Sequence, residues 1–193
     1  SKNLPKVEDL IGKQLSPYAI SKYVNELYAK NFSELYNLNT IGLWYFNVFG
    51  PRQDPEGPYA AVIPKFINKF INLESPVING DGNFSRDFTY VSNVVDMNLL
   101  ALINQNNNIK SQVFNVACGG RITIAEMTRL IKNILIKYDS QIKNVDIIFG
   151  DERKGDIPHS NADISKAKNL ISYEPTINFE EGIKKTISWF INK

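Results

Sequence analysis

Tyr18 and Lys22 stand four residues apart, and their side chains could work together as a base. Ser16 is a favourable N-cap and Pro17 a favourable first helical residue, so a helix is predicted to begin just before Tyr18. Residues four apart lie on one face of a helix, which places the ammonium group beside the phenol. A cation about 5 Å from a phenol stabilises the phenolate by ~3 kcal/mol at an effective dielectric constant of about 20. The pair is therefore a candidate general base.

The same spacing also arises by chance in helices where the two residues are an ordinary surface pair. The flanking residues favour the catalytic interpretation. Residues 16–29 read SPYAISKYVNELYA, and residues 44–53 read WYFNVFGPRQ. These segments resemble the extended short-chain dehydrogenases that modify nucleotide sugars, and among them the UDP-N-acetylglucosamine 4-epimerases. The resemblance runs from about Leu15 to the end of the chain.

The resemblance implies a role for Tyr18 and Lys22 with bound NAD. Tyr18 matches the base that takes the proton from the sugar C4 hydroxyl while hydride moves to the nicotinamide. Lys22 matches the residue that stabilises the phenolate and hydrogen-bonds the nicotinamide ribose. Tyr45 and Phe46 match positions beside the nicotinamide, which makes all four residues expected cofactor contacts. No metal is expected, because His159 is the only histidine and has no set of partner ligands.

Asn47 is a candidate ligand on two grounds. It follows a predicted strand, and ligands bind beyond the carboxyl ends of parallel strands. The resemblance places it on the nucleotide diphosphate. It also implies that Arg86 and Arg153 hold phosphate, which suits a guanidinium fork, and that Asp156 binds the ribose hydroxyls. A simple Arg86–Asp87 ion pair is the alternative for that segment.

The remaining candidates line the nucleotide and the sugar. The resemblance places Ala61, Val62 and Lys65 along the nucleotide, at a helix N-terminus that suits an anion. Val77 and Asn79 match positions that flank the uracil, although plain packing explains the apolar members equally well. Ser160 matches a position that sets the width of the sugar pocket. A small residue there favours UDP-GlcNAc and UDP-GalNAc over the unacetylated sugars.

The composition is that of an ordinary globular protein. The chain has 193 residues, 43% of them hydrophobic, and a formal net charge of +2, which indicates no nucleic-acid footprint. We expect no membrane span and see no signal-peptide pattern. Cys118 is the only cysteine, so no internal disulfide can form, and a reducing, cytoplasmic location is expected.

The hydrophobic pattern predicts strands that alternate with helices. Helices are expected over 17–36, 60–72, 94–104, 123–137, 163–171 and 179–191, and strands over 40–48, 77–78, 88–91, 113–117 and 145–149. Thr123 and Glu126 form a predicted capping box. Ser92 or Asn93 is the expected cap of the helix over 94–104. Four of its side chains are expected to point inward: Val95, Leu99, Leu102 and Ile103.

This order predicts an α/β protein with a parallel component. The resemblance makes it the C-terminal part of an NAD(P)-binding Rossmann-like fold plus a small α/β substrate-binding domain. Residues 1–57 are assigned to the end of the Rossmann-like domain and 58–193 mainly to the substrate domain. The strand over 113–117 and the helix over 123–137 are expected to return to the Rossmann sheet. No Gly-rich strand–turn–helix fingerprint precedes Tyr18, so we expect the dinucleotide-binding half to be missing from these residues.

The leading functional prediction is a UDP-sugar 4-epimerase that uses NAD and is a homodimer when intact. A sugar 4,6-dehydratase and a uronate 4-epimerase remain alternatives on the same scaffold. A non-catalytic nucleotide-sugar-binding fragment is the alternative from another class, because the pyrophosphate site for NAD is not present. We expect the 193 residues alone to show no turnover.

Overall fold

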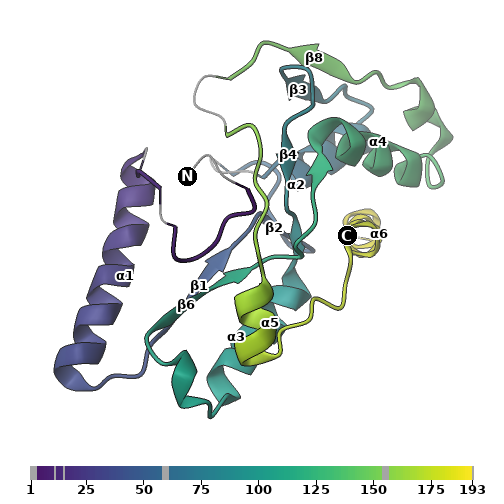
Figure 1. Cartoon of the computed structure of the whole chain (residues 1–193). Helices are drawn as coiled ribbons and strands as arrows, with labels where there is room; N and C mark the ends of the chain where they lie inside the picture. The colour runs from purple at the N-terminus through teal and green to yellow at the C-terminus, as the bar shows by residue number, and fades with distance from the viewer. Residues whose placement is uncertain (1–3, 11, 15, 58–60, 154–156, 193) are drawn as a thin grey trace.

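The computed structural model describes residues 4–10, 12–14, 16–57, 61–153 and 157–192. Strands alternate with helices along the chain (Figure 1). The first half contains α1 (Pro17–Tyr36), β1 (Ile41–Tyr45), β2 (Val48–Phe49), α2 (Val62–Ile71), β3 (Val77–Asn79), β4 (Ser85–Arg86), β5 (Thr89–Tyr90) and α3 (Val91–Ile103). The second half contains η1 (Asn107–Ile109), β6 (Gln112–Val116), β7 (Ile122–Thr123), α4 (Ile124–Leu135), η2 (Ser140–Asn144), β8 (Ile148–Gly150), α5 (Ser165–Ile171) and α6 (Phe179–Ile191).

The described strands pair two by two, and most of the pairs are parallel. β1 pairs with β6, β2 with β5, and β3 with β8 in parallel, whereas β4 pairs with β7 in antiparallel fashion. Parallel pairing needs long crossovers, and helices supply them here. The predicted α/β class with a parallel component is confirmed.

Helix α1 has the bounds that its end signals predict. The Ser16 side chain accepts a hydrogen bond from the Ala19 amide at 3.1 Å, and Asn37 ends the helix with a left-handed φ of 53°. None of its side chains is buried, and Figure 1 shows α1 standing at one side of the molecule. The indole of Trp44 donates to the Glu26 carboxylate at 2.6 Å and joins α1 to β1. The apolar stripe of α1 therefore lies on the surface of the described chain.

The strand predicted over 40–48 is interrupted. β1 ends at Tyr45, and β2 begins at Val48 with β5 as its new partner. Asn47 between them has a left-handed φ of 39°, a conformation that asparagine tolerates better than most residues. Its side chain donates to the Asp87 carbonyl at 2.9 Å, which holds the chain in this bend.

The prediction for α3 was wrong in its cap and in its buried face. Tyr90 is the N-cap, and Asn93 lies inside the helix. The four apolar side chains expected inward are exposed, Leu102 by 81%. The buried positions are instead Asn93, Val94, Met97 and Ala101, because Val94 and Met97 pack in one cluster with Phe114 of β6 and Tyr173.

Two main apolar clusters form the core. The larger one joins α2, α4 and α6 around Phe49, Phe70 and Ile183. The smaller one joins β6, α3 and α5. The expected capping box is present at the start of α4. However, the helix expected over 123–137 on the sheet of β1 is α4, which packs against α2 and α6, whereas α3 and α5 pack in one cluster with β6.

Segments outside these elements also join the core. Lys6, in the segment before α1, forms an isolated parallel bridge with Ala162. The strand expected over 145–149 is β8, which begins later, at Ile148. Within the described part of the chain, no helix combines the length and the apolar character needed to span a bilayer.

Candidate functional site

Tyr18 and Lys22 lie together in the first turns of α1. The Lys22 Nζ atom is 5.3 Å from the centroid of the Tyr18 ring. The Tyr18 side chain is 71% exposed, so its hydroxyl is open to a ligand. The amino end of α1 lies on the side of the molecule toward which β1 and β6 point (Figure 1). The pair thus stands at the edge of the sheet where ligands of α/β proteins bind.

Tyr45 and Phe46 occupy the carboxyl end of β1. The Tyr45 side chain is half exposed, and its hydroxyl donates to Asn98 Oδ1 of α3 at 3.1 Å. The Phe46 amide donates to the Val116 carbonyl at 3.1 Å, which extends the pairing with β6 by one residue. The Phe46 ring packs against Ala117, Ala162 and Ile164. The two residues line the end of the parallel pair, where the resemblance places the nicotinamide.

Asn47 and Asp87 are joined directly. Besides the bond from its side chain to the Asp87 carbonyl, the Asn47 carbonyl accepts the Thr89 amide at 3.3 Å. Asp87 sits between β4 and β5 and is 1% exposed. Its carboxylate accepts the amides of Cys118, Gly119 and Ala162 at 3.1, 3.0 and 3.4 Å. The bend at Asn47 is therefore attached to the loop after β6 and to the segment around Ala162.

Residues 158–160 lie along β4 as a further extended segment. The Ser85 amide donates to the Pro158 carbonyl, and the Ser160 amide donates to the Ser85 carbonyl, both at 2.9 Å. The Ser85 hydroxyl and His159 Nδ1 are 2.8 Å apart. Arg86 Nη1 donates to the carbonyls of Ser85 and Pro158 at 2.9 and 3.2 Å. These bonds bring Arg86 and Ser160, 74 residues apart in the chain, into one substructure.

The other candidates lie around this substructure on separate elements. Ala61 is the N-cap of α2 and has no side-chain capping bond, and Lys65 is exposed on the first turn. Val77 and Asn79 are the exposed ends of β3, paired with Ile148 and Gly150 of β8. The remaining three candidates are Val62, which is partly buried, Arg153, which is exposed, and Asp156, which lies outside the described residues.

Asp87 is the residue that the sequence analysis underestimated. It was considered only as an ion-pair partner of Arg86, whereas its carboxylate binds three backbone amides. Burial raises the pKa of Asp87 to about 6, although the three amide bonds act in the opposite direction. The sequence does contain a signal for a buried Asp87. Ser85, Asp87 and Thr89 are polar residues at every second position, so they share one face of an extended segment, and all three are buried.

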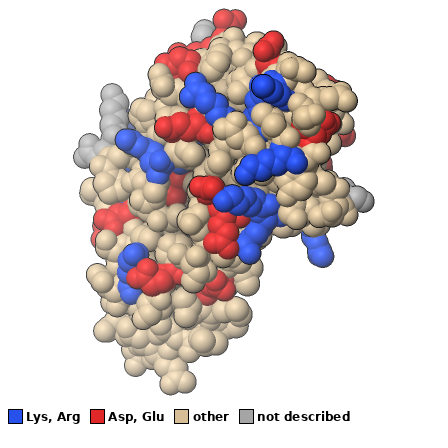
Figure 2. Space-filling view, turned by 90° about the vertical axis from the view of Figure 1, so that its right-hand side faces the viewer, with Lys and Arg blue, Asp and Glu red and all other residues tan. Residues whose placement is uncertain are grey.

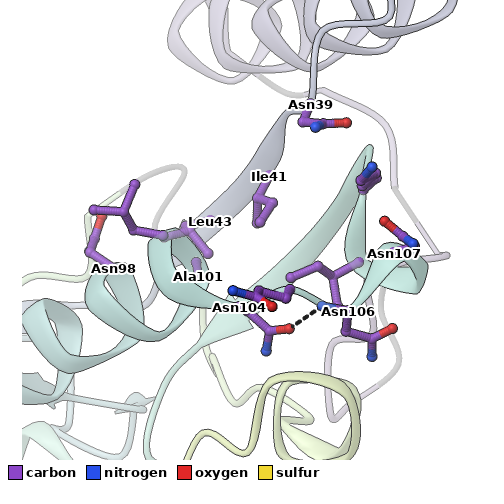
Figure 3. A pocket seen from close by; sticks show the side chains of 12 residues that line it. Asn39, Ile41, Leu43, Asn98, Ala101, Asn104, Asn106 and Asn107 are labelled. Atoms are coloured by element: carbon purple, nitrogen blue, oxygen red, sulfur yellow. Dashed lines mark hydrogen bonds between the residues drawn. The ribbon is translucent and has the colours of Figure 1, made fainter.

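A cavity of about 570 Å³ lies at the opposite end of β1 (Figure 3). Ile41 and Leu43 of β1 and Ala101 of α3 form its apolar wall, and Asn104 and Asn106 stand at its rim. No predicted site residue that the structure describes lines it. The cavity is thus an open apolar groove between β1 and α3, away from the carboxyl ends of the strands.

The face that carries α4 and α6 has mixed charge (Figure 2). Lysine and arginine side chains alternate there with acidic ones, and Lys184 pairs with Glu180 at 2.6 Å on α6. Surface pairs of this kind contribute little to stability. This face therefore shows no single-sign field of the kind that binds a polyanion.

Comparison with a family model identifies much of the chain. Residues 2–117 match the model described as NAD dependent epimerase/dehydratase family. Over 189 residues the chain is 39% identical to a protein of Methanocaldococcus jannaschii named putative UDP-glucose 4-epimerase. It is 34% identical over 188 residues to a UDP-glucuronate 4-epimerase of Thermodesulfobacterium geofontis. These alignments cover 98% and 96% of this chain, but 58% and 54% of the relatives.

Solved structures show the same fold. A UDP-N-acetylglucosamine 4-epimerase from Methanobrevibacter ruminantium, in complex with UDP-N-acetylmuramic acid, superposes with a TM-score of 0.89 at 46% identity. A UDP-glucose 4-epimerase from Thermotoga maritima, with UDP-glucose, also gives 0.89, at 37% identity. The two superpositions cover 98% and 100% of this chain, but only 58% and 60% of the solved chains. The fold, the parallel strands and the family model together show that the chain belongs to the NAD dependent epimerase/dehydratase family, with the extended short-chain dehydrogenase fold.

Proposed function

We propose that this chain carries the catalytic base and the nucleotide-sugar site of an NAD-dependent 4-epimerase that interconverts UDP-GlcNAc and UDP-GalNAc. The observation that carries the proposal is the Lys22 ammonium lying 5.3 Å from the centre of the exposed Tyr18 ring, on the side of the molecule toward which β1 and β6 point (Figure 1). Relatives named UDP-glucose, UDP-glucuronate and UDP-N-acetylglucosamine 4-epimerase support the reaction class.

In this proposal Tyr18 and Lys22 handle the proton. The Tyr18 oxygen accepts the proton of the sugar C4 hydroxyl and returns it after the 4-keto sugar has turned over. The Lys22 ammonium places a positive charge beside the phenol ring of this base. NAD, when bound, supplies the hydride acceptor and donor at C4. Tyr45 and Phe46 are placed at its nicotinamide end, because both lie at the carboxyl end of β1.

The diphosphate and the sugar occupy the substructure around β4. Arg86 and Arg153 are placed on the phosphates, and Asn47 donates to the diphosphate. The Asn47 side chain already donates to the Asp87 carbonyl, and Arg86 donates to the carbonyls of Ser85 and Pro158, so both side chains are held in place. Ser160 lies next to this point on the strand-like segment of residues 158–160. Its small side chain leaves room for an N-acetyl group at the sugar.

We further propose that the 193 residues need a dinucleotide-binding half to turn over. Among the described strands, β1 pairs only with β6, so its other edge is open to a further strand. The groove between β1 and α3 and the face of α1 expose many apolar side chains, and such surfaces mark contacts with other parts of a protein. The complete protein is proposed to be a homodimer in a reducing compartment.

Binding of UDP-GlcNAc to the 193-residue chain tests the nucleotide-sugar site. Calorimetry should detect binding, and Arg86→Ala and Arg153→Ala should each weaken it by about tenfold or more, as expected for a lost charged hydrogen bond. Arg129→Ala is the matched control, because Arg129 is an exposed arginine of α4 outside the site. Equal affinity in all four proteins would overturn the assignment.

Product analysis tests the reaction class. NMR of the sugars formed by the chain joined to a dinucleotide-binding half should show the C4 epimer, whereas a 4-keto-6-deoxy product would make the protein a dehydratase. Conversion of UDP-glucuronate but not of UDP-GlcNAc would favour a uronate epimerase, the class to which one relative is assigned by name. Turnover by the 193 residues alone would contradict the need for the second half.

A further inference from the structure

The site proposed above is assembled from four separate segments of the chain, and one buried residue, Asp87, joins them through its carboxylate, its main-chain carbonyl and its place directly after β4. The segments are the bend at Asn47, strand β4, the loop after β6 and residues 158–162. Asp87 Oδ1 binds the Cys118 amide, and Oδ2 binds the amides of Gly119 and Ala162. Its main-chain carbonyl binds the Asn47 side chain.

Three of the proposed ligands, Asn47, Arg86 and Ser160, lie at or within two residues of these anchor points. Arg86 directly precedes Asp87, and Asn47 contacts the Asp87 carbonyl. Ser160 is two residues from Ala162, and its own amide is fixed to the Ser85 carbonyl. Loss of the Asp87 side-chain bonds would therefore release the Ala162 segment, which carries Ser160, from the point where Arg86 and Asn47 meet.

We propose that Asp87 is the positioning residue of the nucleotide-sugar site, acting through Asn47, Arg86 and Ser160 rather than by touching substrate. The inference rests on the proposed function, since it concerns the geometry of that same site. The carboxylate is suited to the task because both of its oxygens accept hydrogen bonds, and buried amides without acceptors are strongly unfavourable.

The ionised form is the one that satisfies all three amides. A proton on either oxygen, or the amide group of an asparagine, replaces an acceptor by a donor that faces a backbone N–H. Burial raises the pKa of this carboxyl to about 6, so Asp87 takes up its proton within a range of pH that is accessible to experiment. Two other titratable groups interact with Asp87: Cys118, at the end of β6, and Tyr173, after α5. Burial raises the pKa of both.

The test compares three forms of the 193-residue chain by calorimetry with UDP-GlcNAc. Asp87→Asn should raise the Kd about tenfold or more, as for loss of charged hydrogen bonds. Asn93→Ala is the matched control. Asn93 is also fully buried and also joins distant segments, but its shorter bonds go to Thr176 and Ile177, and it contacts Cys118 only at Sγ, at 3.6 Å, and not at the amide that Asp87 binds. It should lower stability and leave the Kd within about twofold of wild type. Equal affinity in wild type and Asp87→Asn would overturn the inference.

A second measurement decides the matter if Asp87→Asn does not fold. In the wild-type chain, the Kd for UDP-GlcNAc should rise as the pH falls from about 7.5 to about 5, in step with NMR shifts of the Cys118 and Gly119 amides. UDP-GlcNAc is the probe because its diphosphate, unlike that of UDP, carries no proton that titrates near pH 6. His159→Gln controls for the imidazole bound to Ser85 and should keep the pH dependence.

The possible failures are distinguishable. A Kd that is independent of pH, or unchanged amide shifts, would overturn the role of Asp87 and leave the site itself standing. Absence of UDP-GlcNAc binding by the folded wild-type chain, with the amide titration intact, would overturn the proposed function and the inference with it.

Discussion

The carboxylate of Glu8 accepts the backbone amide of Asn115 at 2.8 Å, although 107 residues separate them. Glu8 is 9% exposed and reaches the middle of β6 from the segment before α1. The Asn115 side chain completes the contact, since it donates to the carbonyls of Lys6 and Asp163. The residues around Glu8 are thus tied to the strand that carries the candidate site at its end.

Glu8→Ala should destabilise the chain. The substitution leaves the buried Asn115 amide without its acceptor, which costs about 1–3 kcal/mol in free energy of unfolding. Urea denaturation measures the loss. Asp9→Ala is the control, because Asp9 is the exposed neighbour and its removal should change stability by less than about 0.5 kcal/mol. Equal midpoints for the two variants would show that the Glu8 bond contributes nothing.

Glu26→Gln should alter the pH dependence of stability. Burial raises the pKa of Glu26, and the hydrogen bond from Trp44 opposes this only partly. An acid with a raised pKa binds its proton more tightly in the folded state, so its contribution is present at low pH and is lost as the pH rises. Glutamine keeps an acceptor for the indole without a charge. The variant should therefore gain stability relative to wild type between about pH 4 and pH 7, as measured by urea midpoints. A relative loss over that range would contradict the assignment.

Asp87→Asn should change the pH dependence of stability in the same direction as Glu26→Gln, and by a larger amount. The pKa of Asp87 rises from its ordinary 3.8 to about 6. Its contribution to the free energy of unfolding is therefore greatest below about pH 4 and is lost as the pH passes through about 6, by at most about 3 kcal/mol. As the pH rises through this range, the free energy of unfolding of wild type should fall relative to that of Asp87→Asn, as measured by thermal or urea unfolding.

Asp81→Asn is the control for that measurement. Asp81 is an exposed aspartate in the turn before β4, and hydrogen bonds from Asn83 lower its pKa. The sign of its pH dependence is consequently opposite, since the contribution of Asp81 is present at neutral pH and is lost on acidification. Identical pH profiles for the two variants would contradict the burial argument for Asp87.

Tyr18→Phe should remove catalysis without affecting the fold. In the complete enzyme, kcat for UDP-GlcNAc should fall by about 10²–10⁴, the usual contribution of general base catalysis, with little change in KM. Tyr28→Phe is a matched control, because Tyr28 is a similarly exposed tyrosine of α1. Lys22→Met should also lower kcat, because it removes the positive charge beside the phenol ring. An unchanged kcat in Tyr18→Phe would exclude Tyr18 as the base.

The local elements were largely predictable. Ser16 and Pro17 specify where α1 begins, and the capping box of Thr123 and Glu126 specifies the start of α4, because these signals act between residues three or four apart. The spacing of Tyr18 and Lys22 likewise determined that they share a helix face. The amino-acid pattern also indicated the α/β class.

The amino-acid sequence by itself thus determined where the α-helices and most of the strands form, and which two side chains stand together on α1. Only the tertiary structure decided which face of α3 is buried, where the chain bends at Asn47, and that Asp87 binds amides instead of pairing with an arginine. These features depend on partners far along the chain, such as Cys118 and Ala162 for Asp87, which are 31 and 75 residues away. Periodicity marks a residue as apolar or polar, but burial and hydrogen bonding follow from what the folded chain brings against it.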